Sequence, residues 1–245
     1  MYHKTADEIM ALDPDLAIIS VGSLEQHGPH LPVMTDWAIA TELGKRVAAK
    51  MGAFLVPALP ISTCREQMGK KGSVWMEPTT FYQMMTDIIM SLKVQGFKKV
   101  GILQCHGGIF IMTPLVRDLN ARNNPDLMVA VVSGDTWGAI LQQEGILESY
   151  DLHAGESETS RMLAIAPDTV HMDRVVDCIP SVPRSYLNYG SVFRASPSGV
   201  WGEPSRATVE KGEKIFERTA EIAVEELNKA FSYMESKEKF NYSYF

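Results

Sequence analysis

A short segment near the start of the sequence contains side chains that can bind a metal ion. Glu25 and His27 are two residues apart, so in an extended chain both side chains point the same way and can reach one centre or two adjacent ones. Asp36 ends a loop rich in glycine and proline that can fold back on them. Imidazole and carboxylate groups without a thiolate indicate Zn²⁺, Mn²⁺ or Fe²⁺ rather than a structural zinc site built from cysteines.

Two later segments carry the same kinds of side chain. His106 precedes a pair of glycines, and His153 is followed by Glu156 and Glu158. Several of these groups are carboxylates that can bridge two cations, so we expect a two-metal centre. In such centres the ions lie about 3.5–4 Å apart and share a water molecule, whose pKa they lower until it becomes a nucleophile.

Taken singly, each residue also has a purely structural interpretation. Glu25 and His27 could be solvated loop residues, because short motifs have a high false-positive rate. His106 could lie in a tight turn that needs the glycines after it. Glu156 and Glu158 could be acidic residues of a first helical turn, where the helix dipole favours them. The predicted position of all three segments just beyond strand ends favours a shared site, because open α/β sheets place their ligand crevice there.

The elements that must position these residues alternate between strand and helix. Short apolar runs rich in Val, Ile and Leu are predicted to be buried parallel strands: Leu16–Val21, Phe54–Leu59, Lys99–Leu103 and Leu127–Val132. Longer amphipathic segments between them are predicted to be crossover helices: Trp37–Met51, Thr79–Gln95 and Thr113–Arg122. This order predicts an α/β protein with three layers, α/β/α, around a mostly parallel central sheet.

The end of the sequence is predicted to add one more helix to this arrangement. The segment from Ala207 to about Glu235 has one charged face and is expected to pack outside the sheet. We find no internal repeat and no Gly/Ser linker, so residues 1–245 are predicted to form a single domain. The tail 237–245 is expected either to move freely or to pack on a neighbouring subunit.

The composition of this 245-residue chain excludes several classes of protein. Its 45% hydrophobic and 22% charged residues are ordinary globular values, which exclude a disordered, collagen-like or coiled-coil chain. The net charge of −7, without a basic stripe, argues against nucleic acid as the main partner. No apolar run approaches the roughly 18 residues of a membrane helix, and the three cysteines suit a reducing compartment. We therefore expect a cytoplasmic protein that acts on a small molecule.

Together these segments resemble the creatininase family of metal-dependent amidohydrolases. The resemblance runs from about residue 5 to Glu217. It is carried by Glu25-x-His27-Gly28-x-His30-Leu31-Pro32, Thr35-Asp36, His106-Gly107-Gly108, His153-Ala154-Gly155-Glu156-x-Glu158-Thr159-Ser160, and the segment from Gly199 to Gly212. It implies a three-layer α/β fold, a homo-oligomer that is often a hexamer, and a centre of two divalent ions, Zn²⁺ or Mn²⁺, with Fe²⁺ in some relatives.

The resemblance also implies which residues hold the two ions. Glu25, Asp36 and His106 would hold one ion. His27 and Asp36 would hold the other, so that Asp36 bridges the pair.

The last ligand of the second ion is the point at which this sequence departs from the family pattern. In the enzyme that gives the family its name, that ligand is a glutamate two residues after the turn histidine, where this sequence has Gly108. Relatives with two glycines in this turn draw the carboxylate from the His-Ala-Gly-Glu segment instead. This assigns Glu156 as the metal ligand, with Glu158 as the competing candidate.

The activity implied by the resemblance is hydrolysis of a small cyclic amide or formamide. Activated water would attack the carbonyl carbon, and His153 would deliver a proton to the leaving nitrogen. Glu158 would orient groups or relay protons, and the alternative for His153 is a helix cap or a residue that orients a metal ligand. The family's usual turn has Asn at both ends, whereas this sequence has Gln104 and Ile109, so hydrolysis of creatinine itself is not expected.

Two other functions remain open at this point. Some relatives resemble hydrolases that open cyclic keto-sugars such as oxidised inositols, in which water attacks a ketone and a C–C bond breaks. The other alternative is a non-catalytic, metal-stabilised assembly subunit, which an open, carboxylate-rich ligand set disfavours.

Two further segments are expected to shape the pocket. The loop Arg65–Trp75 resembles the family's substrate-side loop, in which Glu66 and Ser73 would face the crevice. The segment Pro183–Trp201 is rich in aromatic residues and Arg, which is the composition of interface cores, so it is expected to form a lid or, preferably, a subunit contact.

Overall fold

A four-stranded parallel sheet forms the centre of the computed structural model, which describes residues 3–236. The strands lie in the order β2-β1-β3-β4. They are β1 (Leu16–Val21), β2 (Phe54–Leu59), β3 (Lys99–Gln104) and β4 (Met128–Ser133). Each is a short run rich in Val, Ile and Leu, and every residue of β1 is buried, as expected for a parallel strand covered on both faces. The predicted strands are therefore confirmed, with small shifts at the ends of β3 and β4.

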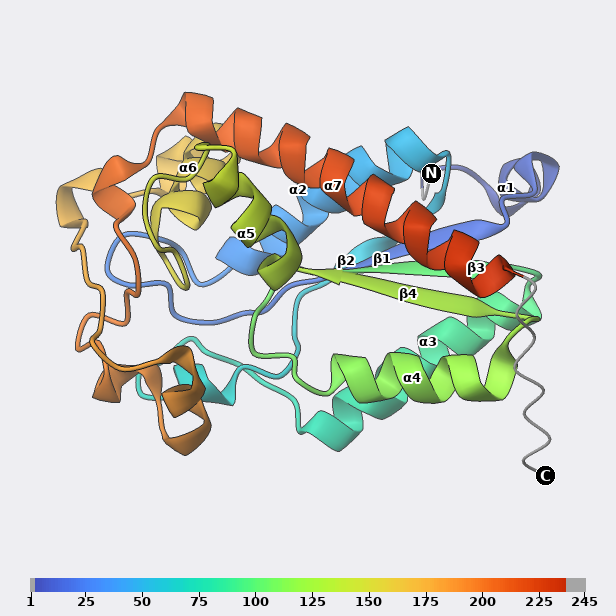
Figure 1. Ribbon diagram of the computed structural model, residues 1–245, viewed down its shortest axis with the longest axis horizontal. Helices are drawn as coiled ribbons and strands as arrows, with labels where there is room; N and C mark the ends of the chain where they lie inside the picture. Colours follow the sequence, from blue (N-terminus) through green and yellow to red (C-terminus); the bar gives the residue numbers. More distant parts are fainter. Residues whose placement is uncertain (1–2, 237–245) are drawn as a thin grey trace.

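Helices cover both faces of this sheet (Figure 1). One face carries α2 (Thr35–Met51), α5 (Gly134–Gln143), α6 (Glu156–Ile165) and α7 (Val209–Glu235). The other face carries α3 (Pro78–Val94) and α4 (Met112–Asn123). The core is divided in the same way, because Ile18 packs with the first group of helices and its strand neighbour Ile19 with the second. The three-layer α/β/α prediction is confirmed.

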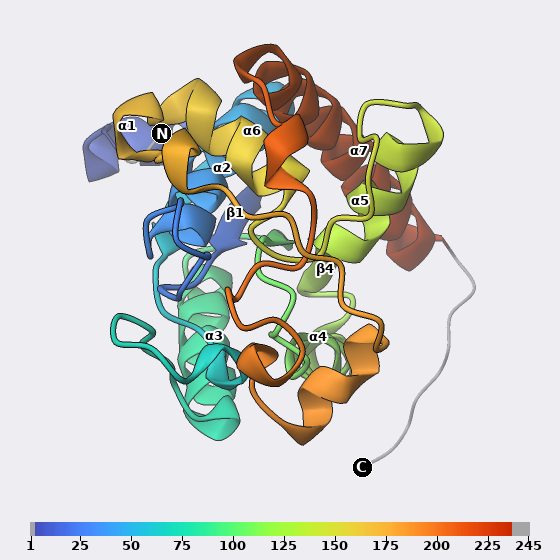
Figure 2. The same ribbon diagram turned by 90° about the vertical axis from the view of Figure 1, so that its left-hand side faces the viewer.

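The connections between strands place a crevice at one end of the sheet. From β1 the chain crosses one face through α2 to reach β2, and from β3 it crosses the other face through α4 to reach β4. The loops that follow the adjacent strands β1 and β3 therefore turn to opposite faces of the sheet. They diverge at the carboxyl ends of these strands, which is where open α/β sheets bind ligands. These loops lie at the left of Figure 1 and face the viewer in Figure 2.

Two of the helices are not predicted from the sequence, and the start of a third, α6, is predicted only as the structural interpretation of Glu156 and Glu158. The short helix α1 (Ala6–Leu12) precedes β1 and begins with a capping box, in which Thr5 accepts a hydrogen bond from the Glu8 backbone N–H. Helix α5 follows β4 directly, and α6 starts in the predicted site segment. Helix α6 packs closely on α7, because a Cβ at Gly212 would lie 2.0 Å from the Ser160 carbonyl oxygen.

The chain between α6 and α7 runs mainly through short 3₁₀ turns over the crevice. Backbone bridges join Cys178 to Gly202 and His153 to Trp201, so residues 178–202 are closed at their base and attached to the chain before α6. The tail 237–245, for which two outcomes are expected above, lies outside the described residues. Among residues 3–236, no helix is long and apolar enough to cross a membrane.

Candidate metal centre

The side chains of Glu25, Asp36 and His106 meet at the carboxyl end of the sheet. Glu25 follows β1, Asp36 lies in the first turn of α2, and His106 follows β3. His106 Nδ1 lies 3.1 Å from Asp36 Oδ2 and 3.3 Å from Glu25 Oε2. All three residues are buried, and one ligand atom from each lies within 4.8 Å of the others. This trio is the set that the family resemblance assigns to the first ion.

A second trio shares Asp36 with the first. His27 Nε2 lies 3.1 Å from Asp36 Oδ1 and 3.6 Å from Glu158 Oε2. The Nδ1–H of His27 donates to the backbone carbonyl of Glu25 at 3.1 Å, which leaves Nε2 as the nitrogen that faces the carboxylates. Asp36 therefore presents one carboxylate oxygen to each of two histidines, which is the arrangement of a bridging ligand.

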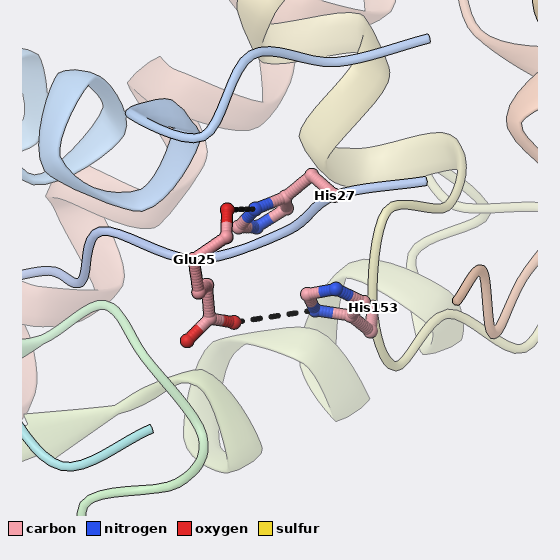
Figure 3. Close-up of side chains that lie close together, drawn as sticks. All are labelled: Glu25, His27 and His153. Carbon is pink, nitrogen blue, oxygen red and sulfur yellow. Dashed lines mark hydrogen bonds and ion pairs between the residues drawn. The ribbon is translucent and has the colours of Figure 1, made fainter. Parts of the chain in front are cut away.

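His153 lies beside Glu25 of the first trio and His27 of the second (Figure 3). Its Nδ1 lies 3.5 Å from Glu25 Oε1, and its ring centroid lies 4.4 Å from that of His27. The Nε2–H donates to the backbone carbonyl of Gln26 at 2.8 Å. Burial and the neighbouring charge of His27 hold the pKa of His153 well below its ordinary value. His153 is therefore a neutral imidazole whose free Nδ1 faces the cluster.

The hydrogen bonding and charge of the cluster fit a cation. Both oxygens of the Glu25 carboxylate are buried and accept no hydrogen bond within the described part of the chain, and buried carboxylates normally pair or bind metals because isolated burial is costly. Burial raises the pKa of Glu25 to about 8. Burial lowers the pKa of His27, but the carboxylates of Asp36 and Glu158 outweigh it and raise that pKa to about 10. The cluster thus attracts positive charge, and its oxygen and imidazole donors suit Zn²⁺ or Mn²⁺.

Asp36 keeps its negative charge at the centre of the cluster. Burial alone would raise its pKa, but the charges and hydrogen bonds of His27 and His106 lower it well below its ordinary value. The hydroxyl of Ser23 also donates to Asp36 Oδ2 at 2.9 Å. The position in the first turn of α2 adds the favourable helix dipole.

The structure does not bring Glu156 to this cluster, contrary to the preferred sequence assignment. Its Oε2 accepts hydrogen bonds from the backbone N–H groups of residues 148 and 149 and from the Ser149 hydroxyl, each at 3.0 Å. Its Oε1 lies 2.6 Å from Lys211 Nζ. The two glutamates are the first and third residues of α6, so they point about 200° apart around the helix axis. Glu158, the competing candidate, is the one that faces His27.

A cavity of about 500 Å³ opens beside the cluster. His106, His153 and Glu158 line it on the side of the cluster, and Glu66, Phe110 and Arg184 are among the residues of its other walls. The loop Arg65–Trp75 therefore does place Glu66 at the crevice. Ser73 instead joins this loop to the segment after β1, because its hydroxyl accepts from the Gln26 backbone N–H at 3.0 Å and donates to the Gln67 carbonyl at 3.2 Å.

Gln26 is a structural residue of the site that the motif spacing does not identify. It lies between Glu25 and His27 in the sequence and points to the other side of the extended segment. Its side-chain N–H₂ donates to Gln67 Oε1 at 2.7 Å and to the Gly199 carbonyl at 3.2 Å. Gly199 has a φ of +86°, and a Cβ there would lie 2.2 Å from Gln26 Oε1. An amide between two ligand-type residues is the signal that could have identified it.

The fold and the cluster together define a hydrolase of the metal-dependent amidohydrolase type. The family model described as creatinine amidohydrolase matches residues 3–227, and this chain belongs to the creatininase family.

Three curated relatives show the range of names within this similarity. The creatinine amidohydrolase of Pseudomonas putida is 32% identical over 82% of this chain and 84% of its own length. The mycofactocin precursor peptide peptidase of Mycobacterium ulcerans is 29% identical over 87% of this chain and 84% of its own. The 3-dehydro-scyllo-inosose hydrolase of Thermotoga maritima is 27% identical over 82% of this chain and 72% of its own.

Solved structures agree with this assignment. A crystal structure of creatinine amidohydrolase superposes with a TM-score of 0.78 and 26% identity, covering 94% of this chain and 97% of that one. A manganese creatininase gives a TM-score of 0.76 and 28% identity, covering 94% and 98%. A zinc–zinc form of a creatininase mutant gives 0.77 and 26%, covering 94% and 97%. The predicted family, fold and enzyme class are therefore confirmed, and the relatives support a divalent metal.

Proposed function

We propose that this protein uses two divalent ions, Zn²⁺ or Mn²⁺, to hydrolyse a small cyclic amide or formamide. The observation that carries the proposal is Asp36, whose two oxygens each lie 3.1 Å from a different histidine, His27 and His106. A carboxylate in this position can hold two ions side by side. When bound, such ions supply a Lewis acid and an acidified water molecule.

Each ion would have three ligands from this chain. Glu25, Asp36 and His106 would hold the first ion, and His27, Asp36 and Glu158 the second. Three protein ligands leave coordination positions open, as catalytic sites require. With Glu158 rather than Glu156 as the ligand, the carboxylate comes from the third residue of α6 instead of the first, and the number of ligands is unchanged.

His153 is suited to move a proton in this reaction. Its Nε2–H is fixed by the Gln26 carbonyl, so its free Nδ1 can accept a proton beside the cluster and pass it to a leaving nitrogen. Because its pKa lies well below the ordinary value, a proton taken up by His153 is readily given away. His153 also lines the cavity, within reach of a bound molecule.

The cavity supports a small-molecule substrate. Its volume of about 500 Å³ falls within the range of roughly 300–1,000 Å³ that ligand sites occupy. Leu152, Phe110 and Leu187 give apolar wall, and Glu66 and Arg184 give polar groups that can orient a substrate. Because the cluster opens into this cavity, a closed, purely structural metal site is disfavoured, and with it the assembly-subunit alternative.

Ring opening of a cyclic keto-sugar is the second candidate function. The 27% identical relative from Thermotoga maritima is named as a hydrolase of such a substrate. The ligand trios would serve both reactions, because water attacks an sp² carbon in each.

We also propose a cytoplasmic homo-oligomer. Phe110, Tyr186 and Tyr189 are exposed by 64%, 56% and 74% although they are large and aromatic. Exposed aromatic side chains of this kind are enriched in subunit contacts. Sedimentation velocity of the purified protein tests this part, and a monomer at micromolar concentration would contradict it.

Metal analysis followed by a substrate panel tests the proposed function. We expect two equivalents of metal per chain, and release of ammonia or formate, or of a ring-opened amino acid, from at least one amide of the panel. Ring opening of inosose-type ketones with no amide turnover would favour the second candidate. Full activity in protein stripped of metal would refute both.

A further inference from the structure

Glu66 contacts the side of His106 that faces away from the proposed ions. Glu66 belongs to a single 3₁₀ turn, Arg65–Gln67, in the loop that follows β2. Its Oε1 lies 3.0 Å from His106 Nε2, an ion-pair contact that does not meet hydrogen-bond geometry, while Nδ1 of the same ring faces Glu25 and Asp36. The side chain of Glu66 is 15% exposed, and that of His106 is 4% exposed, so water screens this contact little.

The absence of a side chain at Gly108 makes this contact feasible. A Cβ at that position would lie 1.9 Å from Glu66 Oε1 and 2.4 Å from His106 Nε2. The φ of Gly108 is not in the left-handed region, so the backbone itself would accept another residue. Position 108 therefore requires glycine because there is no room for a side chain, and not because of its backbone conformation. The Thr63 hydroxyl also donates to the Gly108 carbonyl at 3.0 Å and ties the two loops together.

The contact determines which nitrogen of His106 is free to bind a metal. A carboxylate beside Nε2 favours the tautomer that carries its proton there, which leaves the Nδ1 lone pair toward Glu25 and Asp36. Carboxylates that accept from the second nitrogen of a metal-binding histidine fix the ring and raise its basicity, and their loss typically costs 10–100-fold in metal affinity.

We propose that Glu66 is a positioning residue of the metal centre, which orients His106 from the space left open by Gly108. This inference rests on the proposed metal centre. Because Glu66 also lines the cavity, the loop that shapes the substrate pocket is the loop that holds the His106 ring in place.

Zinc affinity measured by competition with a chromophoric chelator tests this role without any activity assay. We expect Glu66→Ala to weaken the binding of one zinc ion by about 10–100-fold. Glu66→Gln should retain most of the affinity, because its amide oxygen can accept a hydrogen bond from Nε2–H once the ring is fixed by zinc. The matched control is Glu77→Ala. It removes the exposed ion-pair partner of Arg65, the residue before Glu66, and should leave zinc affinity unchanged.

Two further measurements separate positioning from a general effect on folding. In zinc-loaded protein with ¹⁵N-labelled histidine, the His106 signal should show a protonated Nε2 in the unmodified chain and lose that signature in Glu66→Ala. In thermal unfolding, Gly108→Ala should lower the midpoint more in the unmodified chain than in the Glu66→Ala background, where one of its two clashes is gone.

The outcomes distinguish this inference from the proposed function. Zinc affinity of Glu66→Ala equal to that of the unmodified protein would overturn the positioning role and leave the metal centre standing. Loss of affinity in Glu66→Gln as large as in Glu66→Ala would also overturn it, because tautomer control needs only an acceptor. An unmodified protein that binds no zinc would refute the metal centre and this inference together.

Discussion

The carboxylate of Glu156 and the ammonium group of Lys211 form an ion pair that joins the start of α6 to the start of α7, with Oε1 2.6 Å from Nζ. Glu156 is fully buried and also accepts three hydrogen bonds from residues 148 and 149. Two residues further on, Glu158 faces the opposite way, toward His27. The two glutamates of this motif therefore make different contacts. Glu156 joins α6 to α7, and Glu158 lies in the ligand cluster.

Glu156→Gln should reduce stability and leave metal content unchanged. The amide cannot replace the ion pair with Lys211 or accept all of the present hydrogen bonds, so we expect a loss of about 3 kcal/mol in the free energy of unfolding. Urea unfolding measures the loss, and atomic absorption measures the metal. Loss of one metal equivalent without loss of stability would restore Glu156 as the ligand.

Glu158→Gln should have the reverse effect. Removing the charged ligand beside His27 should release one metal ion per chain and abolish turnover, since the second ion would keep only two protein ligands. Urea unfolding of the metal-free variant should lie close to that of the metal-free unmodified protein. Two retained equivalents of metal would show that the second ion has its carboxylate elsewhere.

Asp36→Ala should release both ions. Each of its oxygens faces a different histidine, so both trios lose a ligand at once. Equilibrium dialysis against zinc should find no tightly bound metal, and the circular dichroism spectrum should verify that the variant is folded. Ser23→Ala, which removes only the hydroxyl that donates to Asp36, is the matched control and should keep both ions. If Asp36→Ala retained two equivalents, the bridging assignment would be wrong.

Removing the metal should reveal how much the buried Glu25 carboxylate destabilises the folded protein. Chelation should lower the thermal midpoint of the unmodified protein, because a ligand that binds only the folded state stabilises it. Above about pH 8, where this carboxyl is ionised, Glu25→Gln should raise the midpoint of the metal-free protein, since a neutral amide replaces a buried carboxylate that accepts no hydrogen bond within residues 3–236. The same variant should respond less to added zinc. A metal-free Glu25→Gln variant that is less stable than its parent at this pH would contradict this account.

The stability of the metal-free protein should fall between about pH 4 and pH 7 because of Asp151. Burial, with a further contribution from the charge of Glu158, raises the pKa of Asp151 from 3.8 to about 7. In that interval the folded state holds a proton that the unfolded state has released, so the free energy of unfolding decreases as pH rises and levels off above pH 7.

Asp151→Asn removes this titration and provides the measurement. Relative to its parent, the variant should gain on the order of 3 kcal/mol between pH 4 and pH 7, as followed by urea unfolding at each pH. Asp173→Asn, at a side chain that is 78% exposed, is the control and should show no such gain. A constant difference between Asp151→Asn and its parent across this range would contradict the raised pKa.

The sheet was predictable from the sequence because its strands are continuous apolar runs, fully buried in β1 and partly buried in the edge strand β2. The runs Leu16–Val21 and Phe54–Leu59 coincide with β1 and β2, since continuous apolar stretches between turn residues leave little choice of boundary. Helix α6 was not predictable from periodicity, because the face that it buries is polar. Ser157, Thr159 and Ser160 are all buried there, so no apolar stripe marks the helix.

Within the site, the identity of the residues was easier to predict than the direction in which each side chain points. The convergence of Glu25 and His106 on one site was predictable, because each follows a predicted strand, whereas the adjacency of β1 and β3 that brings them together is seen only in the structure. The choice between Glu156 and Glu158 depends on the residue at which a helix begins, because this decides which of two nearby carboxylates faces the cluster. Helix α6 begins after Gly155 without a side-chain cap, so the local sequence does not mark that boundary.

The backbone bridge between Cys178 and Gly202 has a consequence for how substrate preference could diverge. It closes the base of the excursion that carries Arg184, Leu187 and Ser191 to the cavity wall. We expect that the tip of this excursion, residues 180–197, can be exchanged as a unit if Arg184, which donates to the Gly107 carbonyl beside His106, is kept. Chimeras that carry residues 180–197 from relatives acting on other molecules should change the cavity wall that contacts the substrate and leave the ligand cluster unaltered.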